Sequence, residues 1–232
     1  MRMEKNNLSA QEDFSTRDKV LYTAAMLFFE RGYEKTTVKE IARLAEVNRG
    51  SVFFAIKNKE HLLYTLVSFV LENLFTSGHP AIEETDDPIL NYTVEMALQF
   101  YMTESREQVR ELAIMAYALP TTSELIYRRT AVRLAELLGE YNPTWEEKDF
   151  FEHAIASDSI MRGYMARPCD LYFTMERKMR VFLETTLTIY NVPKEKIDEA
   201  AAFLSNLDMA TLAKRTIDEL LKVLKTKDYA SK

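Results

Sequence analysis

Two short helices joined by a tight turn, predicted for residues 36–56, constrain the fold of this chain more than any other feature. Thr37 followed by Glu40 is a capping-box pattern, in which hydroxyl and carboxylate each satisfy a free backbone N–H at a helix start. Asn48 is the expected cap of the second helix. The apolar residues recur at helical spacing and predict one buried face: Val38, Ile41, Ala42, Ala45, Val52 and Ile56. The second helix then exposes Asn48, Arg49 and Ser51, whose groups suit phosphate and base-edge contacts, although an ordinary helical hairpin with a polar rim remains the alternative.

The flanking segments extend the pattern. A helix is expected to open at residues 15–18 and to end at Gly32, and another is expected to follow Asn58 and continue to Phe75. The segments in register are Leu27-Phe28-Phe29-Glu30-Arg31-Gly32-Tyr33, Thr36-Thr37-Val38, Ile41-Ala42, Val47-Asn48-Arg49-Gly50-Ser51-Val52-Phe53 and Lys57-Asn58-Lys59-Glu60. Residues 16–63 thereby resemble the DNA-binding domain of the TetR family of bacterial transcription regulators.

The resemblance implies that the second helix of the pair is a recognition helix that binds double-stranded operator DNA. The residues expected to contact DNA are Thr37, Lys39, Asn48, Arg49, Ser51, Phe53, Phe54 and Lys59. The chain departs from the family pattern in the turn, where Glu46 replaces the usual Gly, and at Ile56, which replaces the usual Phe. Phe53 and Ala55 stand where Tyr and His are usual, so two phosphate hydrogen bonds are expected to be missing.

The distribution of charge agrees with a DNA-binding N-terminal part. The whole chain has a net charge of −6, yet residues 15–63 hold nine basic and six acidic side chains. Residues 64–232 hold 19 basic and 27 acidic side chains. Positive charge is therefore concentrated where DNA contact is expected, and the acidic remainder should stay away from the duplex.

The rest of the chain predicts an all-α protein, because no strand-like alternation persists and Pro and Gly fall between helical runs. We expect an N-terminal arm and three-helix helix-turn-helix domain over residues 1–63, with a disordered lead-in to residue 11, and a larger helical regulatory domain over 64–232. Capping-box patterns at residues 105–108, 121–124 and 144–147 predict further helix starts. Helices are expected over 88–102, 145–166, 171–190 and 193–204, with an acidic loop over 82–87 and an amphipathic last helix.

Nothing in the sequence favours an enzyme or a bound cofactor. There is no glycine-rich phosphate loop, nucleophile elbow or zinc-protease motif, and a single cysteine, Cys169, excludes an internal disulfide. Asp149 and His153 have ligand-like spacing, but two ligands do not hold a metal, and a surface ion pair is the expected role. Without a signal peptide or a membrane-length apolar run, a cytoplasmic protein is expected.

An aromatic and methionine-rich population follows residue 88 and fits either a plain core or a cavity for an apolar ligand. TetR-type proteins usually enclose a small-molecule site among their central helices, so the resemblance favours a cavity. The residues expected to bind the unknown effector are Tyr92, Met96, Phe100, Tyr101, Met115, Tyr117, His153, Met161 and Tyr164. Few cationic residues share these stripes, which favours an apolar, uncharged or cationic compound.

Two late helices keep an apolar stripe that predicts a homodimer, since two such helices per chain form a four-helix bundle in proteins of this kind. The expected interface residues are Phe150, Ala154, Ile155, Met179, Phe182, Leu183, Thr186 and Leu187. The sequence thus predicts a homodimeric, ligand-responsive regulator, most simply a repressor released from a palindromic operator by a small apolar effector. Two alternatives stay open: a DNA-binding regulator that responds to a protein partner, and an all-α enzyme.

Overall fold

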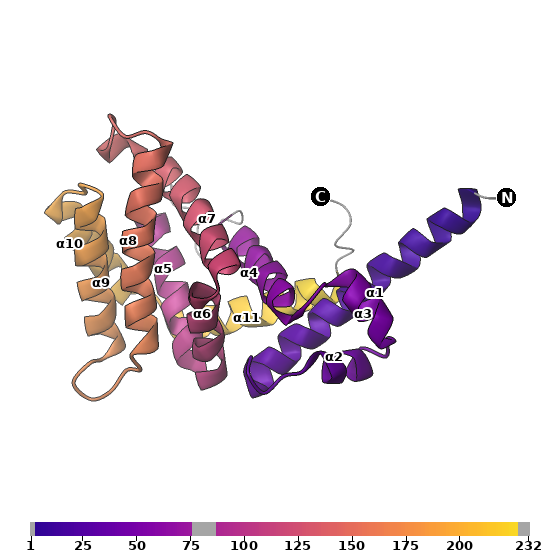
Figure 1. Ribbon diagram of the computed structural model, residues 1–232. Coiled ribbons are helices and arrows are strands. Elements are labelled where there is room, and N and C mark those ends of the chain that lie inside the picture. The colour runs from indigo at the N-terminus through magenta and orange to yellow at the C-terminus, as the bar shows by residue number, and fades with distance from the viewer. Residues whose placement is uncertain (1–2, 76–86, 227–232) are drawn as a thin grey trace.

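The computed structural model describes residues 3–75 and 87–226, and the regular structure of this part is entirely helical. Figure 1 shows a smaller N-terminal part and a larger C-terminal part side by side. The helices are α1 (Met3–Arg31), α2 (Val38–Leu44), α3 (Arg49–Ala55), α4 (Lys59–Phe75), α5 (Pro88–Ser105), α6 (Glu107–Ala118), α7 (Pro120–Leu138), the short η1 (Gly139–Tyr141), α8 (Glu147–Ala166), α9 (Met175–Ile189), α10 (Lys194–Ser205) and α11 (Met209–Thr226).

The N-terminal part, which we call the head, consists of α1, α2, α3 and the beginning of α4. Apart from the start of α1, the helix caps of the head are those expected from the sequence. Thr37 and Glu40 form the capping box of α2, and the Asn48 side chain accepts a hydrogen bond at the start of α3. Asn58 does the same for α4, where its Oδ1 accepts from the backbone N–H of His61 at 2.7 Å. Gly32 closes α1 with a φ of 86°, a left-handed conformation that favours glycine.

The first helix is longer than the sequence suggested. We expected a disordered lead-in to residue 11 and a helix start near residue 15, but α1 begins at Met3. The segment before residue 15 contains no Gly or Pro and several good helix formers, so nothing in it stops the helix. The expected acidic loop lies mostly outside the described residues, but its last member, Asp87, caps α5.

Three of the four capping boxes expected from the sequence are wrong. Ser105 is the last residue of α5, and its hydroxyl donates to the carbonyl oxygen of Met102 at 2.6 Å. Pro120 is the first residue of α7, where its fixed φ and missing N–H suit a helix start, so Thr121 lies inside the helix. The cap of α8 is Glu146, two residues beyond the expected Thr144. The Asp149 carboxylate accepts from the backbone N–H of Glu146 at 2.8 Å.

The larger part is built around α5, whose described side chains are buried on most sides. It packs against α6, α7, α10 and α11, while α7 and α8 pack on each other. The helix α9 begins at Met175 rather than at residue 171, because the Asp170 carboxylate turns the chain by accepting from the backbone N–H groups of Tyr172 and Phe173, both at 2.8 Å. Thr174 then caps the helix.

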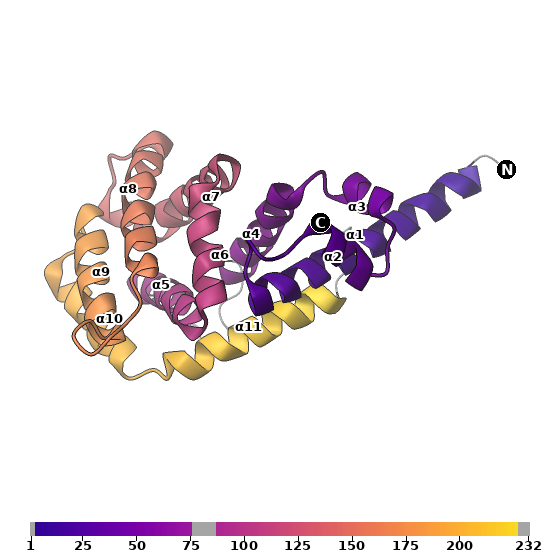
Figure 2. The same cartoon turned by 60° about the horizontal axis from the view of Figure 1, so that its bottom comes forward.

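The last helix, α11, connects the two parts of the molecule. It runs from the end of α10 past α5 to α1, as Figure 2 shows along the lower edge. Leu220 and Leu224 near its end are 8% and 4% exposed and join the hydrophobic core of the head. The C-terminal segment therefore extends the core of the head instead of forming a separate lobe. None of the described helices has the length and apolar character needed to cross a membrane.

Candidate DNA-binding surface and effector pocket

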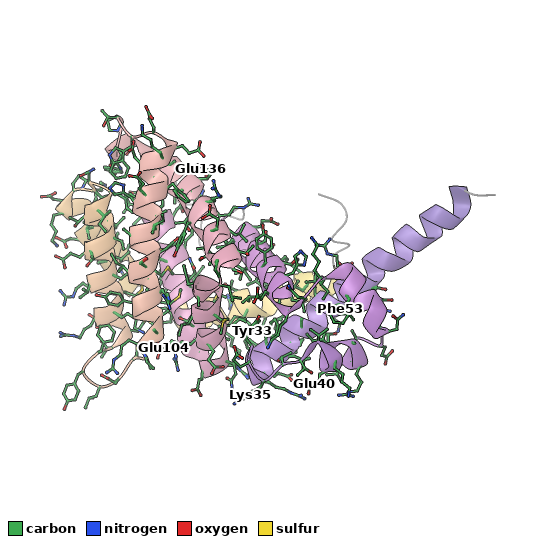
Figure 3. All side chains as sticks on the ribbon, in the orientation of Figure 1. Tyr33, Lys35, Glu40, Phe53, Glu104 and Glu136 are labelled. Carbon is green, nitrogen blue, oxygen red and sulfur yellow. The ribbon has the colours of Figure 1, made fainter. Side chains whose placement is uncertain are left out.

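The helix α3, which was predicted to be the recognition helix, is exposed at its start, where Asn48 and Gly50 are accessible. Val52 and Ile56 are 1% and 2% exposed and hold its inner face against the head core. The Oδ1 atom of Asn48 accepts from the backbone N–H of Ser51 at 2.8 Å, which orients the start of the helix. Phe53 is 45% exposed, and Figure 3 shows it on α3 at the outer side of the head. Arg49 and Phe54 belong to α3 by their backbone.

The turn between α2 and α3 has the strained geometry that the sequence implied. Glu46 has a φ of 58°, in the left-handed region. A residue with a Cβ costs about 1–2 kcal/mol in this conformation. The turn is held by a hydrogen bond from the backbone N–H of Val47 to the carbonyl oxygen of Ala42 at 3.0 Å. Glu46 thus adopts the left-handed conformation that a glycine would adopt at this position at lower cost.

The remaining DNA candidates lie at other helix starts of the head. Thr37 is the cap of α2, and Lys39 follows it with an exposed side chain. Lys59 is the first residue of α4, with its ammonium 4.1 Å from the centre of the Tyr33 ring. Its Nζ also donates to the carbonyl oxygen of Glu34 at 3.5 Å. Burial lowers the pKa of Lys59. The ammonium groups of Lys39 and Lys59 are of a kind that suits phosphate oxygens, whereas the Thr37 hydroxyl already donates to Glu40 at 3.0 Å.

The residues predicted for ligand binding do not converge on one cavity. Tyr92, Met96, Phe100 and Met161 are at most 6% exposed and belong to the core of the larger part. Met115 packs against the core of the head instead. Tyr101 lines a separate hollow between α5, α9 and α10, and Tyr164 lies beside Phe173 at the far end of α8.

His153 and Asp149 form neither a ligand site nor the surface ion pair that we expected. The Nδ1 atom of His153 lies 2.7 Å from the backbone carbonyl oxygen of Asp149, not from its carboxylate. The imidazole ring packs on Trp145, with ring centres 4.1 Å apart. Among the residues that the structure describes, no group of three or more His, Cys, Asp or Glu side chains is arranged to hold a metal ion.

An apolar cavity of about 160 Å³ lies between α4, α5, α6 and α7. Of the ligand candidates from the sequence, only Tyr117 lines it. The other lining residues were not among the candidates, and most of them come from α4, which leaves the head, and from the short α6. They include Leu63, Leu66, Val70, Leu112, Ile126 and Met165. Their apolar spacing was visible, but spacing alone does not separate a cavity wall from a packed core.

The cavity and the head share a wall. Leu63 and Leu66 on α4 line the cavity and also belong to the hydrophobic core of the head, where they are 0% and 6% exposed. Ala116 and Ile126 on the opposite side belong to the core of the larger part. The side chains of Leu63 and Leu66 thus serve both the cavity wall and the core of the head.

The apolar residues predicted to form the dimer interface are mostly buried within the single chain. Seven of the eight expected interface side chains are at most 5% exposed: Phe150, Ala154, Met179, Phe182, Leu183, Thr186 and Leu187. Because they pack within the chain, they have almost no surface left for a partner. Ile155, at 38% exposed, is the one that faces outward. The apolar spacing correctly indicated that these side chains are buried, but it did not show whether their own chain or a partner buries them.

Comparison with known proteins also identifies a helix-turn-helix domain in the N-terminal part of the chain. Residues 20–65 match the family described as bacterial regulatory proteins, tetR family. The probable HTH-type transcriptional regulator YttP of Bacillus subtilis (strain 168) is 29% identical over 158 residues, which cover 66% of this chain and 70% of YttP. The HTH-type transcriptional repressor BepR of Brucella suis biovar 1 (strain 1330) is 29% identical over 101 residues, which cover 42% of this chain and 48% of BepR.

The fold also agrees with a solved repressor. SmeT, the repressor of the Stenotrophomonas maltophilia multidrug efflux pump SmeDEF, superposes with a TM-score of 0.54 at 19% sequence identity, covering 75% of this chain and 91% of SmeT. These relatives are transcription regulators and not enzymes. Residues 20–65 thus carry the domain that is described for bacterial regulatory proteins of the tetR family, and the whole chain resembles transcription regulators of that family.

Proposed function

We propose that this transcription regulator is a homodimeric repressor that leaves a palindromic operator when a small, largely apolar effector enters the cavity beside α4. The observation that carries the proposal is the shared wall, in which Leu63 and Leu66 serve both the cavity and the core of the head. BepR is described as a repressor, which supports repression rather than activation as the action of this protein.

The size of the cavity supports a mechanical link. At about 160 Å³, it is smaller than the roughly 300–1,000 Å³ of most small-molecule sites. We infer that a ligand of ordinary size enters by parting α4 from α6 and α7. Two heads on one face of a duplex need a spacing of about 34–36 Å or a multiple of it. A tilt of α4 changes the spacing between the two heads. The ligand shifts the equilibrium between the DNA-binding and the more widely spaced conformation only if it binds the wider one more tightly.

DNA binding is assigned to the N-terminal half of α3. Arg49 is its first residue, next to the cap Asn48, and a guanidinium group suits both phosphate and base-edge contacts. Exposed Lys39 and half-buried Lys59 flank it with further positive charge. The acidic balance of residues 64–232 keeps the remainder of the chain away from the duplex.

The test of this assignment compares Arg49→Ala with Arg49→Lys on a duplex selected from a random pool by the wild-type protein. Arg49→Ala should weaken specific binding by about 1–3 kcal/mol. Arg49→Lys keeps the charge but loses the two-pronged hydrogen-bonding geometry, so it should keep binding to random DNA and lose selectivity. Footprints identical to the wild type for both variants would exclude α3 as the recognition helix.

For the homodimer, we place the interface on the outward face of α8, around Ile155. Its exposed neighbours on α8 include the small Ala156 and Ser159, which allow close approach of a second helix, and the larger Glu152. Ile155→Glu should produce monomers in light scattering, because it would place an unpaired carboxylate in the interface. Leu44→Glu, a matched change at an exposed apolar residue of the head, should remain dimeric. A dimer that survives Ile155→Glu would contradict this placement.

A further inference from the structure

Asp158 on α8 is a carboxylic acid in the interior of the larger part. It is 4% exposed, and the hydroxyl of Thr130 on α7 hydrogen-bonds to it. Its Oδ2 atom is buried and has no hydrogen-bond partner among the described residues. A buried polar atom without a partner costs free energy, so a native protein that keeps one commonly uses it.

The other ionised groups buried nearby are paired, and Asp158 is not. Glu95 on α5 accepts from the Nε atom of Arg133 on α7 at 3.1 Å. Lys178 on α9 donates to Glu104 at 3.1 Å. No ion pair of Asp158 occurs in residues 3–75 or 87–226. The interior therefore holds one carboxyl group whose natural counter-charge is not supplied by the described part of the chain.

Aromatic residues surround this carboxyl group. The charge of Asp158 acts on the phenols of Tyr92, Tyr117 and Tyr190, whose pKa values are raised mainly by burial. Tyr92 donates to the Thr186 hydroxyl at 3.1 Å, and the Tyr190 hydroxyl lies 2.9 Å from that of Ser157. A carboxylate among tyrosine rings is a combination that attracts ammonium groups by charge and by cation–π interaction.

The acid lies just beyond the apolar cavity. Tyr117 lines the cavity and also interacts electrostatically with Asp158, so it is a neighbour of both. On α7, Thr130 follows the cavity residue Ile126 by four positions, about 6 Å along the helix. On α8, Asp158 precedes the cavity residue Met165 by seven positions, about 10 Å. The cavity and the carboxyl group thus lie at successive positions along the contact between α7 and α8.

We propose that Asp158 binds the positively charged head of a cationic amphiphilic effector, whose apolar chain occupies the cavity beside α4. This inference rests on the proposed function, since it names the chemical class of the effector for that cavity. Tyr117 must turn aside to join the cavity to the carboxyl group. The ammonium group then supplies the counter-charge and hydrogen bond that Oδ2 lacks.

The experiment uses octylamine and octanol as probes, because they share an apolar chain and differ in the charge of the head. Calorimetry on the full-length wild type should show tighter binding of octylamine. In Asp158→Asn, octylamine should bind about 10- to 100-fold more weakly, as expected for losing a charge-assisted hydrogen bond, while octanol should bind as before. Glu152→Gln, which removes an exposed carboxylate from the same helix, should leave both affinities unchanged.

The outcomes separate the two proposals. If octanol binds and Asp158→Asn changes both affinities equally, Asp158 is a structural residue and the inference is overturned. An octylamine affinity that falls equally in Glu152→Gln would reduce the effect to general attraction by an acidic protein, which also overturns it. If neither probe binds in the cavity of the wild type or of any variant, the cavity itself fails, and with it the proposed function.

Discussion

The ammonium group of Lys59 lies 4.1 Å from the centre of the Tyr33 ring and 3.5 Å from the carbonyl oxygen of Glu34, so the start of α4 is joined to the segment that follows α1. This contact holds the charge beside the helix-turn-helix without burying it fully. Figure 3 shows Tyr33, Lys35 and Glu40 within the head, away from Glu104 and Glu136 in the larger part. We therefore expect Lys59 to contact phosphate and not to read bases.

Lys59→Ala should weaken binding to all duplexes to a similar degree. The loss of one phosphate contact should reduce the slope of log K against log salt by about 0.9. Fluorescence anisotropy on selected and random duplexes over a range of salt concentrations measures both quantities. Lys214→Ala on the exposed face of α11 is the control and should behave as the wild type. A loss confined to the selected duplex would assign Lys59 to base recognition instead.

Asp158 should make stability fall as pH rises. Burial raises the pKa of Asp158 from 3.8 to about 7, so between these values the folded state holds a proton that the unfolded state has lost. The resulting penalty is absent below pH 3.8, grows through this window and is complete above pH 7, where it reaches about 4 kcal/mol at most. Tyr92, Tyr117 and Tyr190 around it have raised pKa values and stay neutral throughout.

Chemical denaturation of Asp158→Asn tests this dependence. The variant should be more stable than the wild type at pH 8, and the difference should shrink towards pH 4. Glu152→Gln, at an exposed position of the same helix, should show no such pH-dependent gain. A difference that is constant with pH would mean that the Asp158 carboxyl group does not change ionisation in this range.

The last helix should stabilise the head although it lies at the other end of the chain. Leu220→Ala removes a side chain that is 8% exposed from the head core, which should cost about 2–5 kcal/mol. Hydrogen exchange should become faster in α1 and α11 and stay unchanged in α8. Glu219→Ala, one residue earlier on the exposed face, should have little effect. Unchanged protection of α1 in Leu220→Ala would contradict the packing of α11 on the head.

A buried ion pair should hold the segment between α8 and α9. Lys178 is 1% exposed, and its ammonium donates to Glu104 at 3.1 Å and to the carbonyl oxygen of Arg167 at 2.6 Å. Glu104→Gln leaves that ammonium without its counter-charge and should cost on the order of 3 kcal/mol. Adding Lys178→Met should recover much of the loss in urea denaturation. Additive losses would show that the two side chains do not act as a pair.

The head was predictable because its signals are local. A cap such as Thr37 or Asn48 and a left-handed glycine such as Gly32 act within a few residues, so sequence spacing fixes them. Where two local signals competed, the prediction failed: Pro120 took the first helical position before Thr121 could act as a cap. The length of α1 was missed since a polar segment without Gly or Pro gives no stop signal.

The site in the larger part was not predictable to the same extent, because it depends on contacts between distant segments. The spacing of Phe182 and Leu183 indicates burial, yet the chain itself buries them and leaves nothing for a dimer partner. Leu63 was assigned to a helix but not to a cavity wall. Asp158 resembles any polar residue of a surface helix until the packing of α7 and α8 encloses it.

The most direct test of the central claim, that the cavity and the DNA-reading helices are coupled through α4, is calorimetry of octylamine binding with and without the selected operator duplex. If the ligand prefers the state that releases DNA, the duplex must weaken octylamine binding by the same factor by which octylamine weakens DNA binding. Coupling of this kind usually amounts to about 5- to 150-fold. The account predicts a loss of affinity within this range, and equal octylamine affinities for the free and the DNA-bound protein would contradict it.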